Sequence, residues 1–268
     1  MSDKERKAIK NGEIINESEA VLPVTSREVQ YSFSVYEALR IIGGHIVHLS
    51  DHLKRLSISC RDIALVHPFS DELIAASLDA LIEADNICDA TARILIVGGP
   101  SPLFFVTYTD LLSYPDSYYD EGVALSLYYG ERFLPEAKTS NLLMQYIALE
   151  QAKKAGCFEA LLVNRKGQVL EGTRSNFYGI SGSRIYTAPD EMVLSGITRI
   201  SVLKAASELG FEIVYTPPTD TNLYMFDSLF ISSTSMGAMP VDSVAGNKMR
   251  RDRWDDTKAI CRLERQWE

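Results

Sequence analysis

The spacing of apolar residues in the first part of the chain alternates between the pattern of strands and the pattern of helices. β-Branched and aromatic residues crowd the stretches on either side of Gly43-Gly44, which is typical of two strands joined by a hairpin turn. Further along, Leu53, Leu56 and Ile63 lie on one helical stripe, and Ser50 stands where its side chain would cap that helix. The predicted order is strands at 29–42 and 45–49, helices at 51–65 and 70–86, and strands at 92–99 and 103–112.

The second part begins after a polar, turn-rich stretch, Ser113–Gly122, which is typical of a connection between domains. Mixed strands and helices on both sides of that stretch predict an α/β (α+β) protein with two domains. The expected boundaries are a small N-terminal domain at 1–115, a connector at 116–122 and a larger domain at 123–268. The larger domain has predicted strands at 123–129, 159–164, 169–180, 184–188, 211–216 and 225–234, and predicted helices at 141–156 and 196–210.

Composition and charge narrow the classes of partner. The chain has 268 residues, of which 46% are hydrophobic and 24% charged, as is ordinary for a folded protein of this length. Its net charge of -9 disfavours binding to nucleic acid or to an anionic membrane, because both need a positive surface. The four cysteines form no CxxC pair, which disfavours a zinc site and a disulfide framework, so we expect no metal.

The N-terminal residues and the cysteines indicate one compartment. A signal peptide needs an apolar run, whereas this chain begins with closely spaced charges. No stretch approaches the roughly 18 to 20 apolar residues of a membrane span. Scattered free thiols suit a reducing environment. The sequence therefore predicts a cytoplasmic protein without a membrane anchor.

A carboxylate interrupts an apolar stretch in the second part. Glu171 lies within Val169–Ile180, where Leu170, Phe177 and Tyr178 have the pattern of buried strand positions. An unpaired carboxylate in such a place costs several kcal/mol or takes up a proton, so a cationic or hydrogen-bonding group should meet it. Glu171 is therefore a candidate site residue.

Three other features of the second part suit the same chemistry. Lys138 lies in a loop directly before a predicted helix, and Gly196–Thr198 begins another helix, whose free N–H groups form an anion site. Residues 230–237 end a predicted strand in hydroxyl side chains and a glycine. Each feature alone is common. Together with Glu171 they suit pyridoxal phosphate, which needs a lysine amine, a phosphate site and an acid at its ring nitrogen.

Residues 138–180, followed by Leu194–Arg199, resemble the class IV aminotransferases, the pyridoxal-phosphate enzymes of fold type IV. Upstream, residues 35–59 are similar to the family pattern of a glutamate, a hairpin and His-Leu-x-Arg-Leu, and the likeness extends over roughly Gln30 to Val241. The resemblance implies bound pyridoxal 5'-phosphate, a small N-terminal α/β domain, and a larger C-terminal domain with a barrel-like sheet. It also implies a homodimer.

The resemblance implies a role for each matching residue. Lys138 would form the Schiff base with the cofactor, and Glu171 would pair with the pyridine nitrogen. The other implied cofactor contacts are Arg55 at the phosphate, Asn176, the backbone and side chain of Ile197 and Thr198, and the hydroxyls of Thr234 and Ser235, which would complete the phosphate site or face the substrate carboxylate. The implied substrate pocket contains Tyr36, Glu37, Phe33 and Gly98, although the first two suit a core tyrosine and a structural salt bridge equally well.

The chain departs from its relatives where the substrate would bind. Ser32-Phe33-Ser34 replaces a Gly-Asp-Gly turn of many relatives, so that turn must differ. Gly98 stands where the D-amino-acid branch has an arginine, which would remove a bidentate clamp for the substrate carboxylate. Arg40, Arg93 or Arg132 would have to replace that arginine.

The leading prediction is an aminotransferase that moves an amino group from an amino acid, branched-chain-like, or a primary amine to a 2-oxo acid by a ping-pong mechanism. Leu142 stands where branched-chain enzymes tend to have a tyrosine, which leaves the substrate open. The alternative is a 4-amino-4-deoxychorismate lyase of the same fold, which would need no 2-oxo acid. A third possibility is a cofactor-binding protein that catalyses no reaction. The lysine, glutamate and phosphate motifs are all present, which argues against it.

Overall fold

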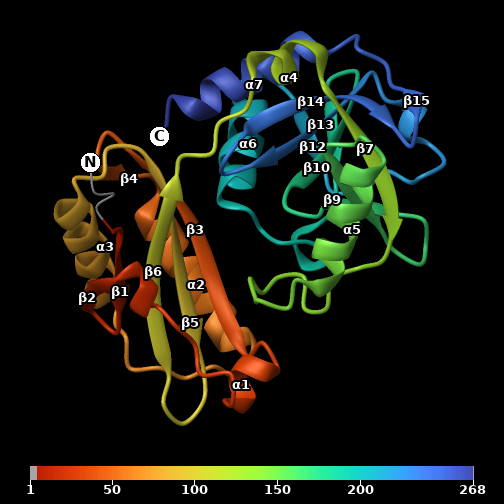
Figure 1. Cartoon of the computed structure of the whole chain (residues 1–268). Coiled ribbons are helices and arrows are strands. Elements are labelled where there is room, and N and C mark those ends of the chain that lie inside the picture. The colour runs from red at the N-terminus through yellow and green to blue at the C-terminus, as the bar shows by residue number, and fades with distance from the viewer. Residues whose placement is uncertain (1–4, 268) are drawn as a thin grey trace. The chain divides into compact units, whose positions relative to one another are not determined.

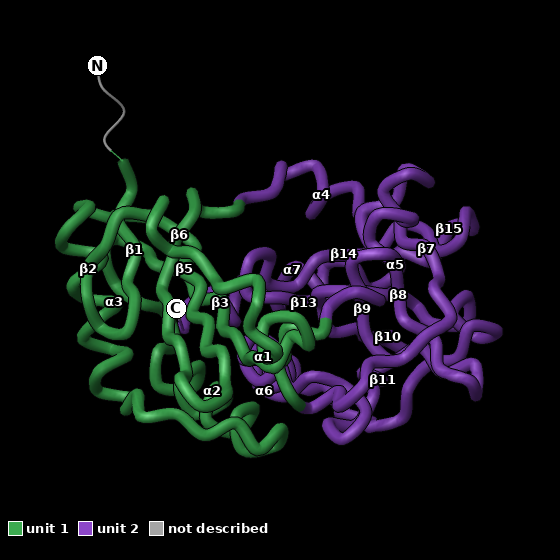
Figure 2. Tube along the Cα trace, turned by 60° about the horizontal axis from the view of Figure 1, so that its bottom comes forward, with its two compact units in different colours: residues 1–112, 137–141 green, residues 113–136, 142–268 purple. Residues whose placement is uncertain are grey.

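The computed structural model describes residues 5–267 and divides into two compact units (Figure 2). The first unit takes the chain up to Leu112 and, in addition, the short segment Ala137–Asn141. The second unit takes Ser113–Glu136 and the chain from Leu142 onward. The stretch expected as a connector, 116–122, forms helix α4 (Asp116–Glu121) and belongs to the second unit. The chain therefore crosses between the units more than once, which no local signal in the sequence announces.

The first unit contains a six-stranded antiparallel sheet with two longer helices. The sheet order is β2-β1-β6-β5-β3-β4. Its strands are β1 (Lys7–Lys10), β2 (Glu13–Asn16), β3 (Ser34–Ile42), β4 (His45–Ile46), β5 (Ala90–Val97) and β6 (Leu103–Asp110). Its helices are the 3-10 turn η1 (Glu17–Glu19), α1 (Arg27–Gln30), α2 (Leu49–Asp62) and α3 (Asp71–Asp85). The sequence analysis missed the β1–β2 hairpin because its strands are short and partly exposed.

One face of this sheet carries the apolar core of the first unit. Along β3, Val35, Leu39 and Ile41 are buried and pack with residues of β5, β6, α2 and α3. Figure 1 shows α2 running along the back of the strands. Because side chains alternate along a strand, Tyr36 on β3 points to the other face, and Arg93 on β5 is exposed there. This second face of the sheet carries the polar groups described below.

The starts of the two helices are set by different groups. Ser70 caps α3 as predicted, because its hydroxyl accepts a hydrogen bond from the Leu73 amide at 3.2 Å. The predicted cap of α2 is wrong: α2 begins at Leu49, so Ser50 lies inside its first turn. His48 precedes the helix with a left-handed φ of 53° and makes no side-chain cap. That conformation turns the chain directly from β4 into α2, and the sequence pattern could not show it.

The second unit combines a nine-stranded sheet with three longer helices (Figure 1). Its strands are β7 (Val123–Tyr129), β8 (Glu159–Val163), β9 (Val169–Gly172), β10 (Asn176–Ser181), β11 (Arg184–Thr187), β12 (Glu212–Val214), β13 (Ser228–Ser233), β14 (Gly237–Val244) and β15 (Asn247–Lys248). Its other elements are α5 (Leu143–Lys154), η2 (Asp190–Met192), α6 (Ile197–Glu208), η3 (Leu223–Met225) and α7 (Trp254–Arg265). The sequence analysis did not predict β14, β15 and α7.

Six strands of the second unit close into a barrel. The order β10-β13-β14-β7-β8-β9 returns on itself, because β9 pairs with β8 on one side and with β10 on the other. Buried residues of these strands, such as Phe177, Leu229 and Met239, form the apolar core of this unit. Helix α7 packs against β14, and α6 packs against β13 and α7. The barrel-like sheet expected of the C-terminal part is confirmed, since closure leaves these strands no free edge.

Between residues 5 and 267, no helix combines the length and the apolar character needed to cross a lipid bilayer.

Candidate active site

Lys138 is held in the first unit by backbone hydrogen bonds on both sides. Its carbonyl accepts a hydrogen bond from the Tyr36 amide at 3.0 Å, and its own amide donates to the Ser59 hydroxyl at 3.0 Å. Thr139 forms a bridge with Val35, and the Ser140 amide donates to the Ser34 carbonyl at 3.0 Å. Segment 137–141 is therefore laid along β3 and tied to the buried side of α2. The lysine that the sequence placed in a loop stands on a rigid base.

The amine of Lys138 and the guanidinium of Arg93 both lie close to one aromatic ring. Lys138 Nζ is 4.6 Å from the centre of the Tyr36 ring, and Arg93 Cζ is 4.2 Å from it. Both distances are within the range of cation–π contacts. The buried hydroxyl of Ser140, two residues after Lys138, has no hydrogen-bond partner. The Tyr36 ring is thus contacted by two cations, the Lys138 amine and the Arg93 guanidinium.

Next to Tyr36 on β3, the buried carboxylate of Glu37 contacts an arginine and a histidine. Glu37 is fully buried, and Arg55 donates to both of its oxygens, from Nε at 2.7 Å and from Nη2 at 2.6 Å. His52 Nδ1 lies 2.8 Å from Glu37 Oε2. Burial by itself would raise the pKa of Glu37, but the hydrogen bonds and charge of Arg55 outweigh it and lower that pKa to about 2. Burial also lowers the pKa of His52, against the pull of Glu37.

The structure therefore places Glu37 and Arg55 in a buried salt bridge, one of the two readings left open by the sequence. Two nitrogens of Arg55 are already engaged with Glu37. The assignment of Arg55 to a phosphate stays a prediction. The pair lies one residue away from Tyr36 and on the opposite face of β3, so it supports the strand that presents that ring.

Phe33 and Gly98, which both depart from the family pattern, lie against each other. A Cβ atom added to Gly98 would lie 2.5 Å from Phe33 Cε1 and 2.8 Å from Leu65 Cγ. The Phe33 ring therefore occupies the space above Gly98, and an arginine at position 98 would not fit unless Phe33 moved. Phe33 also packs against the core of the first unit. Its role in a substrate pocket stays a prediction, while its contact with Gly98 explains why both positions differ together.

In the second unit, a cation and a backbone amide meet Glu171. Glu171 is 5% exposed on β9, and Arg132 Nη1 lies 3.6 Å from its Oε1 atom. The Leu194 amide donates to Glu171 Oε2 at 3.2 Å. Arg132 was expected as a replacement for the missing substrate arginine, and the structure instead places it against this carboxylate. The buried Glu171 carboxylate therefore has a cationic partner within the chain, as its place in an apolar strand predicted.

Asn176 links Glu171 to the start of helix α6. The two residues face each other in the β9–β10 pairing, and the Asn176 side-chain amide donates to the Leu194 carbonyl at 2.9 Å. Its other side-chain atom, Oδ1, would lie only 2.4 Å from a Cβ on Gly196, so this position has room only for glycine. The peptide of Leu194 thus connects to Glu171 through its N–H and to Asn176 through its carbonyl. Asn176 acts here as a structural link.

The first turn of α6 has the character of an anion site. Gly196 precedes the helix and provides no side-chain cap, so the first N–H groups, including those of Ile197 and Thr198, are not used by a capping side chain. Arg199 is 1% exposed and anchors the turn, because it donates to Thr187 Oγ1 at 2.7 Å and to the Ala188 carbonyl at 2.6 Å. Its charge adds to the positive potential at this end of the helix.

The two hydroxyl residues proposed from the sequence lie in the turn between β13 and β14. Ser235 Oγ is 3.2 Å from Ser233 Oγ and 3.3 Å from the Tyr114 hydroxyl, and Thr234 is half-buried beside it. Ser232, just before this turn, pairs with Asn176 across β10 and β13. The hydroxyls therefore lie at the same end of the barrel strands as the Glu171–Asn176 pair.

Glu159 is a site-shaping residue that the sequence analysis missed. It is fully buried at the start of β8, and its carboxylate accepts hydrogen bonds from Thr173 Oγ1 at 2.9 Å, the Arg174 amide at 2.6 Å and Ser175 Oγ at 3.0 Å. These bonds fix the turn that joins Glu171 to Asn176 along the chain. Burial raises the pKa of Glu159, and Arg174 and the hydrogen bonds only partly oppose it. The signal in the sequence that could have identified Glu159 is a glutamate at the first position of an apolar strand.

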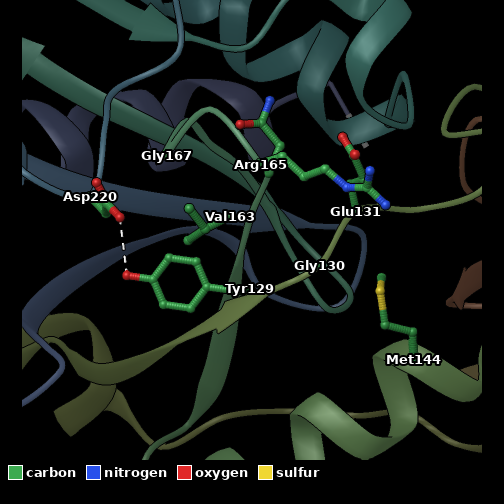
Figure 3. Close-up of a pocket in the computed structure, with 9 residues that line it drawn as sticks. Tyr129, Gly130, Glu131, Met144, Val163, Arg165, Gly167 and Asp220 are labelled. Atoms are coloured by element: carbon green, nitrogen blue, oxygen red, sulfur yellow. Dashed lines mark hydrogen bonds between the residues drawn. The ribbon is translucent and has the colours of Figure 1, made fainter.

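A separate hollow of about 570 Å³ lies where β7 and β8 end (Figure 3). Some of its polar groups are hydrogen-bonded: the Tyr129 hydroxyl donates to Asp220 at 3.0 Å, and the Asn164 side-chain amide donates to Gln168 at 2.8 Å. It is lined by Tyr129, Gly130, Glu131, Met144, Val163, Asn164, Arg165, Gly167 and Asp220, and by none of the site residues proposed from the sequence. We therefore assign it no part in the chemistry.

Comparison with known proteins identifies the family. The model of the amino-transferase class IV family matches residues 34–244, which is most of the chain. The chain belongs to the class IV aminotransferases. A D-alanine aminotransferase from Bacillus licheniformis is 30% identical over 90% of this chain and 89% of its own length. A branched-chain-amino-acid aminotransferase from Salmonella typhimurium is 28% identical, with 88% and 84% covered.

Solved structures confirm the fold type of this aminotransferase. A branched-chain aminotransferase from Thermoproteus uzoniensis superimposes with a TM-score of 0.89 at 24% identity, over 98% of this chain and 94% of that one. An aminotransferase from Mycobacterium tuberculosis in its pyridoxal-phosphate-bound form superimposes with a TM-score of 0.83 at 19% identity. The predicted family, fold and enzyme class are confirmed. The relatives named are aminotransferases, so the lyase alternative is not favoured.

Class IV aminotransferases depend on pyridoxal phosphate, and the residues of this aminotransferase fit that group. The cofactor needs an amine, an acid and an anion site. The first unit offers the Lys138 amine over the Tyr36 ring. The second offers the buried Glu171 carboxylate and the uncapped start of α6. Arg132 lies against this acid and Glu159 holds the turn that follows it. From the sequence, Arg132 was only one of three candidates for the substrate carboxylate, and Glu159 was not singled out.

Proposed function

We propose that this aminotransferase transfers the amino group of an amino acid, branched-chain-like, or of a primary amine to a 2-oxo acid by a ping-pong mechanism, with Lys138 as its catalytic residue. The placement of Lys138 carries this proposal. Backbone bonds to Tyr36 and Ser59 fix the lysine, and its amine lies over the Tyr36 ring on the face of the sheet away from the apolar core. An amine held this firmly is suited to take and return a proton at one defined place.

Pyridoxal phosphate, when bound, supplies a carbonyl carbon that reacts with amines and a ring that accepts the electron pair of the substrate Cα–H bond. Lys138 would hold it through a Schiff base, and the freed Nζ would then take the Cα proton and return it during transfer. The Glu171 carboxylate would keep the ring nitrogen protonated. The N–H groups of Ile197 and Thr198, with the Thr198 hydroxyl, would bind the phosphate, and Arg55 would assist them.

The carboxylate of the substrate would bind to Arg93. Of the three arginines that the sequence left open, Arg132 faces Glu171, and Arg40 is half-buried on β3, four residues after Tyr36. Arg93 is exposed, and its Cζ lies 4.2 Å from the centre of the ring that Lys138 also contacts. An arginine binds a carboxylate through two parallel hydrogen bonds, which would orient the amino group of the substrate toward the lysine. Thr234 and Ser235 would take either this carboxylate or the phosphate.

A homodimer and a cytoplasmic location complete the proposal. Leu143, Tyr146 and Ile147 stand one helical turn apart on α5, with exposures of 69%, 65% and 39%, and such an apolar stripe suits burial against a second copy. The four cysteines are free, as in a reducing compartment. The mass of the purified protein in solution would show a monomer if the dimer is incorrect.

The decisive experiment compares Lys138→Ala with Lys153→Ala, a matched change at an exposed lysine on α5. The unchanged protein should carry a yellow chromophore that amino donors bleach, and borohydride should attach the cofactor to Lys138. Lys138→Ala should lower the rate of bleaching by about a thousandfold or more, because it removes both the covalent link and the proton carrier. Lys153→Ala should behave as the unchanged protein. Full turnover by Lys138→Ala would refute the assignment.

A further inference from the structure

The Glu171 carboxylate is fixed from two sides before any ligand is considered. Arg132 Nη1 lies 3.6 Å from Oε1, and the Leu194 amide donates to Oε2 at 3.2 Å. The two charged side chains are 9% and 6% exposed, so water screens the pair only weakly. Both oxygens of the carboxylate therefore have a protein partner.

Arg132 reaches this position from a loop that otherwise faces outward. Its neighbours Glu131 and Phe133 are exposed, Phe133 by 75%, and Leu134 adopts a left-handed φ of 52°. A non-glycine residue in that conformation is strained. From this loop the Arg132 side chain turns inward and is 9% exposed.

Several polar and charged groups on the elements next to β9 have partners of their own. Glu159 on β8 is bound to the turn 173–175, and Arg174 in that turn lies 4.9 Å from the Phe158 ring. Arg199 on α6 is engaged with Asp190 at 3.0 Å and with Thr187. On β10 the facing residue is the neutral Asn176. Arg132 is a cation that stands directly against this carboxylate, with Nη1 3.6 Å from Oε1.

We propose that Arg132 is a positioning residue that keeps Glu171 an anion, fixed in place, so that the carboxylate is ready for the cofactor's ring nitrogen. The inference rests on the proposed function, because it takes Glu171 as the partner of that nitrogen. At 3.6 Å the contact is longer than a charge-assisted hydrogen bond, so Arg132 acts chiefly through its charge. It does not touch the reacting atoms.

The expected consequence of losing the charge has a definite sign. A cation within about 4 Å lowers the pKa of a carboxylate by about one to three units, so its removal lets Glu171 take a proton at higher pH. A protonated Glu171 no longer pairs with a pyridinium. Cofactor binding should therefore fall on the acid side in Arg132→Met at a pH where the unchanged protein still binds. One pH unit corresponds to about a tenfold change in binding at a given acid pH.

The test measures the dissociation constant of pyridoxal phosphate, by absorbance, from pH 5 to 8 in Arg132→Met, Arg132→Lys, Glu171→Gln and the double variant Arg132→Met/Glu171→Gln. Arg165→Met, at an exposed arginine of the second unit, is the matched control. We expect Arg132→Met to lose about tenfold or more in affinity at pH 5.5 relative to pH 8, beyond the loss of the unchanged protein. Arg132→Lys should restore most of it, and Arg165→Met should show no change.

The double variant distinguishes an effect of the Arg132 charge on Glu171 from a structural effect of losing the arginine side chain. In a Glu171→Gln background there is no carboxylate to titrate, so Arg132→Met should add no further pH dependence. An acid limb that is the same in Arg132→Met and the unchanged protein overturns the proposal, and so does an equal effect of Arg132→Met with and without Glu171. Failure of the proposed function looks different, because the unchanged protein would then bind no cofactor at Lys138.

Discussion

Two buried carboxylates, one in each unit, are stabilised in opposite ways. Glu37 on β3 faces a bidentate arginine and a histidine, and its pKa falls to about 2. Glu159 on β8 is equally buried, but it accepts hydrogen bonds from two hydroxyls and one backbone amide, and its pKa rises. Burial is therefore the same in both regions, and the partners decide the charge.

The comparison shows what each carboxylate is used for. Arg55 donates two hydrogen bonds to Glu37 and keeps it an anion, so that the pair supports the part of β3 that presents Tyr36. Neutral donors let Glu159 shape a turn without demanding a full charge. Glu171 is intermediate, because it has an ion pair at 3.6 Å and one amide.

The largest expected effect comes from removing the two charges by the same substitution. Glu37→Gln should destabilise the first unit by about 3 to 5 kcal/mol, because it removes the negative charge that the buried Arg55 faces through two hydrogen bonds. Glu159→Gln should cost about 1 kcal/mol or less, since the amide still accepts from Thr173 and can donate to Ser175. Hydrogen exchange of β3 and β8 peptides measures the two units separately. Equal losses in both variants would show that the partners do not set the charge.

The acid dependence of stability should differ between the two regions. Glu37 has a pKa of about 2 in the folded protein and 4.5 ordinarily, so its contribution is present above pH 4.5 and is lost as pH falls toward 2. That contribution is roughly 3 kcal/mol. Glu159 has a raised pKa, so its contribution is full below pH 4.5 and declines as pH rises through its folded pKa.

Exchange rates measured from pH 3 to 8 in the unchanged protein and both glutamine variants would reveal these opposite slopes. The acid loss should be weaker in Glu37→Gln, and the loss at higher pH should be weaker in Glu159→Gln. If both variants keep the slope of the unchanged protein, other groups govern its stability in acid.

The smallest change in stability is expected on the exposed face of the first sheet. Arg93→Met removes a charge that neither holds a buried carboxylate nor fills the core, so unfolding should change by about 0.5 kcal/mol or less. The KM for amino acid substrates should nevertheless rise about tenfold or more, as a charged hydrogen bond to the substrate is lost. Arg61→Met, on the exposed side of α2, is the control for KM. An unchanged KM in Arg93→Met would remove Arg93 from the substrate site.

Much of the secondary structure was predictable because it depends on neighbours in sequence. The alternation in β3 and the cap of α3 by Ser70 both follow from residues within one or two turns. The start of α2 was not, because a left-handed His48 has no pattern of its own. The short hairpin β1–β2 and helix α7 were missed for the same lack of a strong local signal.

The candidate site shows the same division. Lys138 and Glu171 were identified from their motifs, and Glu171 also from its unusual place in an apolar strand. Arg132 was named only as one of three candidates for the substrate carboxylate, and Glu159 was not named, since each contacts residues distant in sequence. The meeting of Phe33 with Gly98 was hidden as well, although both positions had been noted as departures from the family.

By itself, the sequence determined most of the longer strands and helices, which family the chain resembles, and that Glu171 needed a partner. Only the tertiary structure decided that Arg132 is such a partner, that Arg55 closes on Glu37, and that six strands complete a barrel. The physical reason is the distance along the chain over which each interaction acts. Periodicity and capping act over a few residues, whereas the charge state of a buried group depends on whatever side chains the folded chain brings within a few ångströms of it.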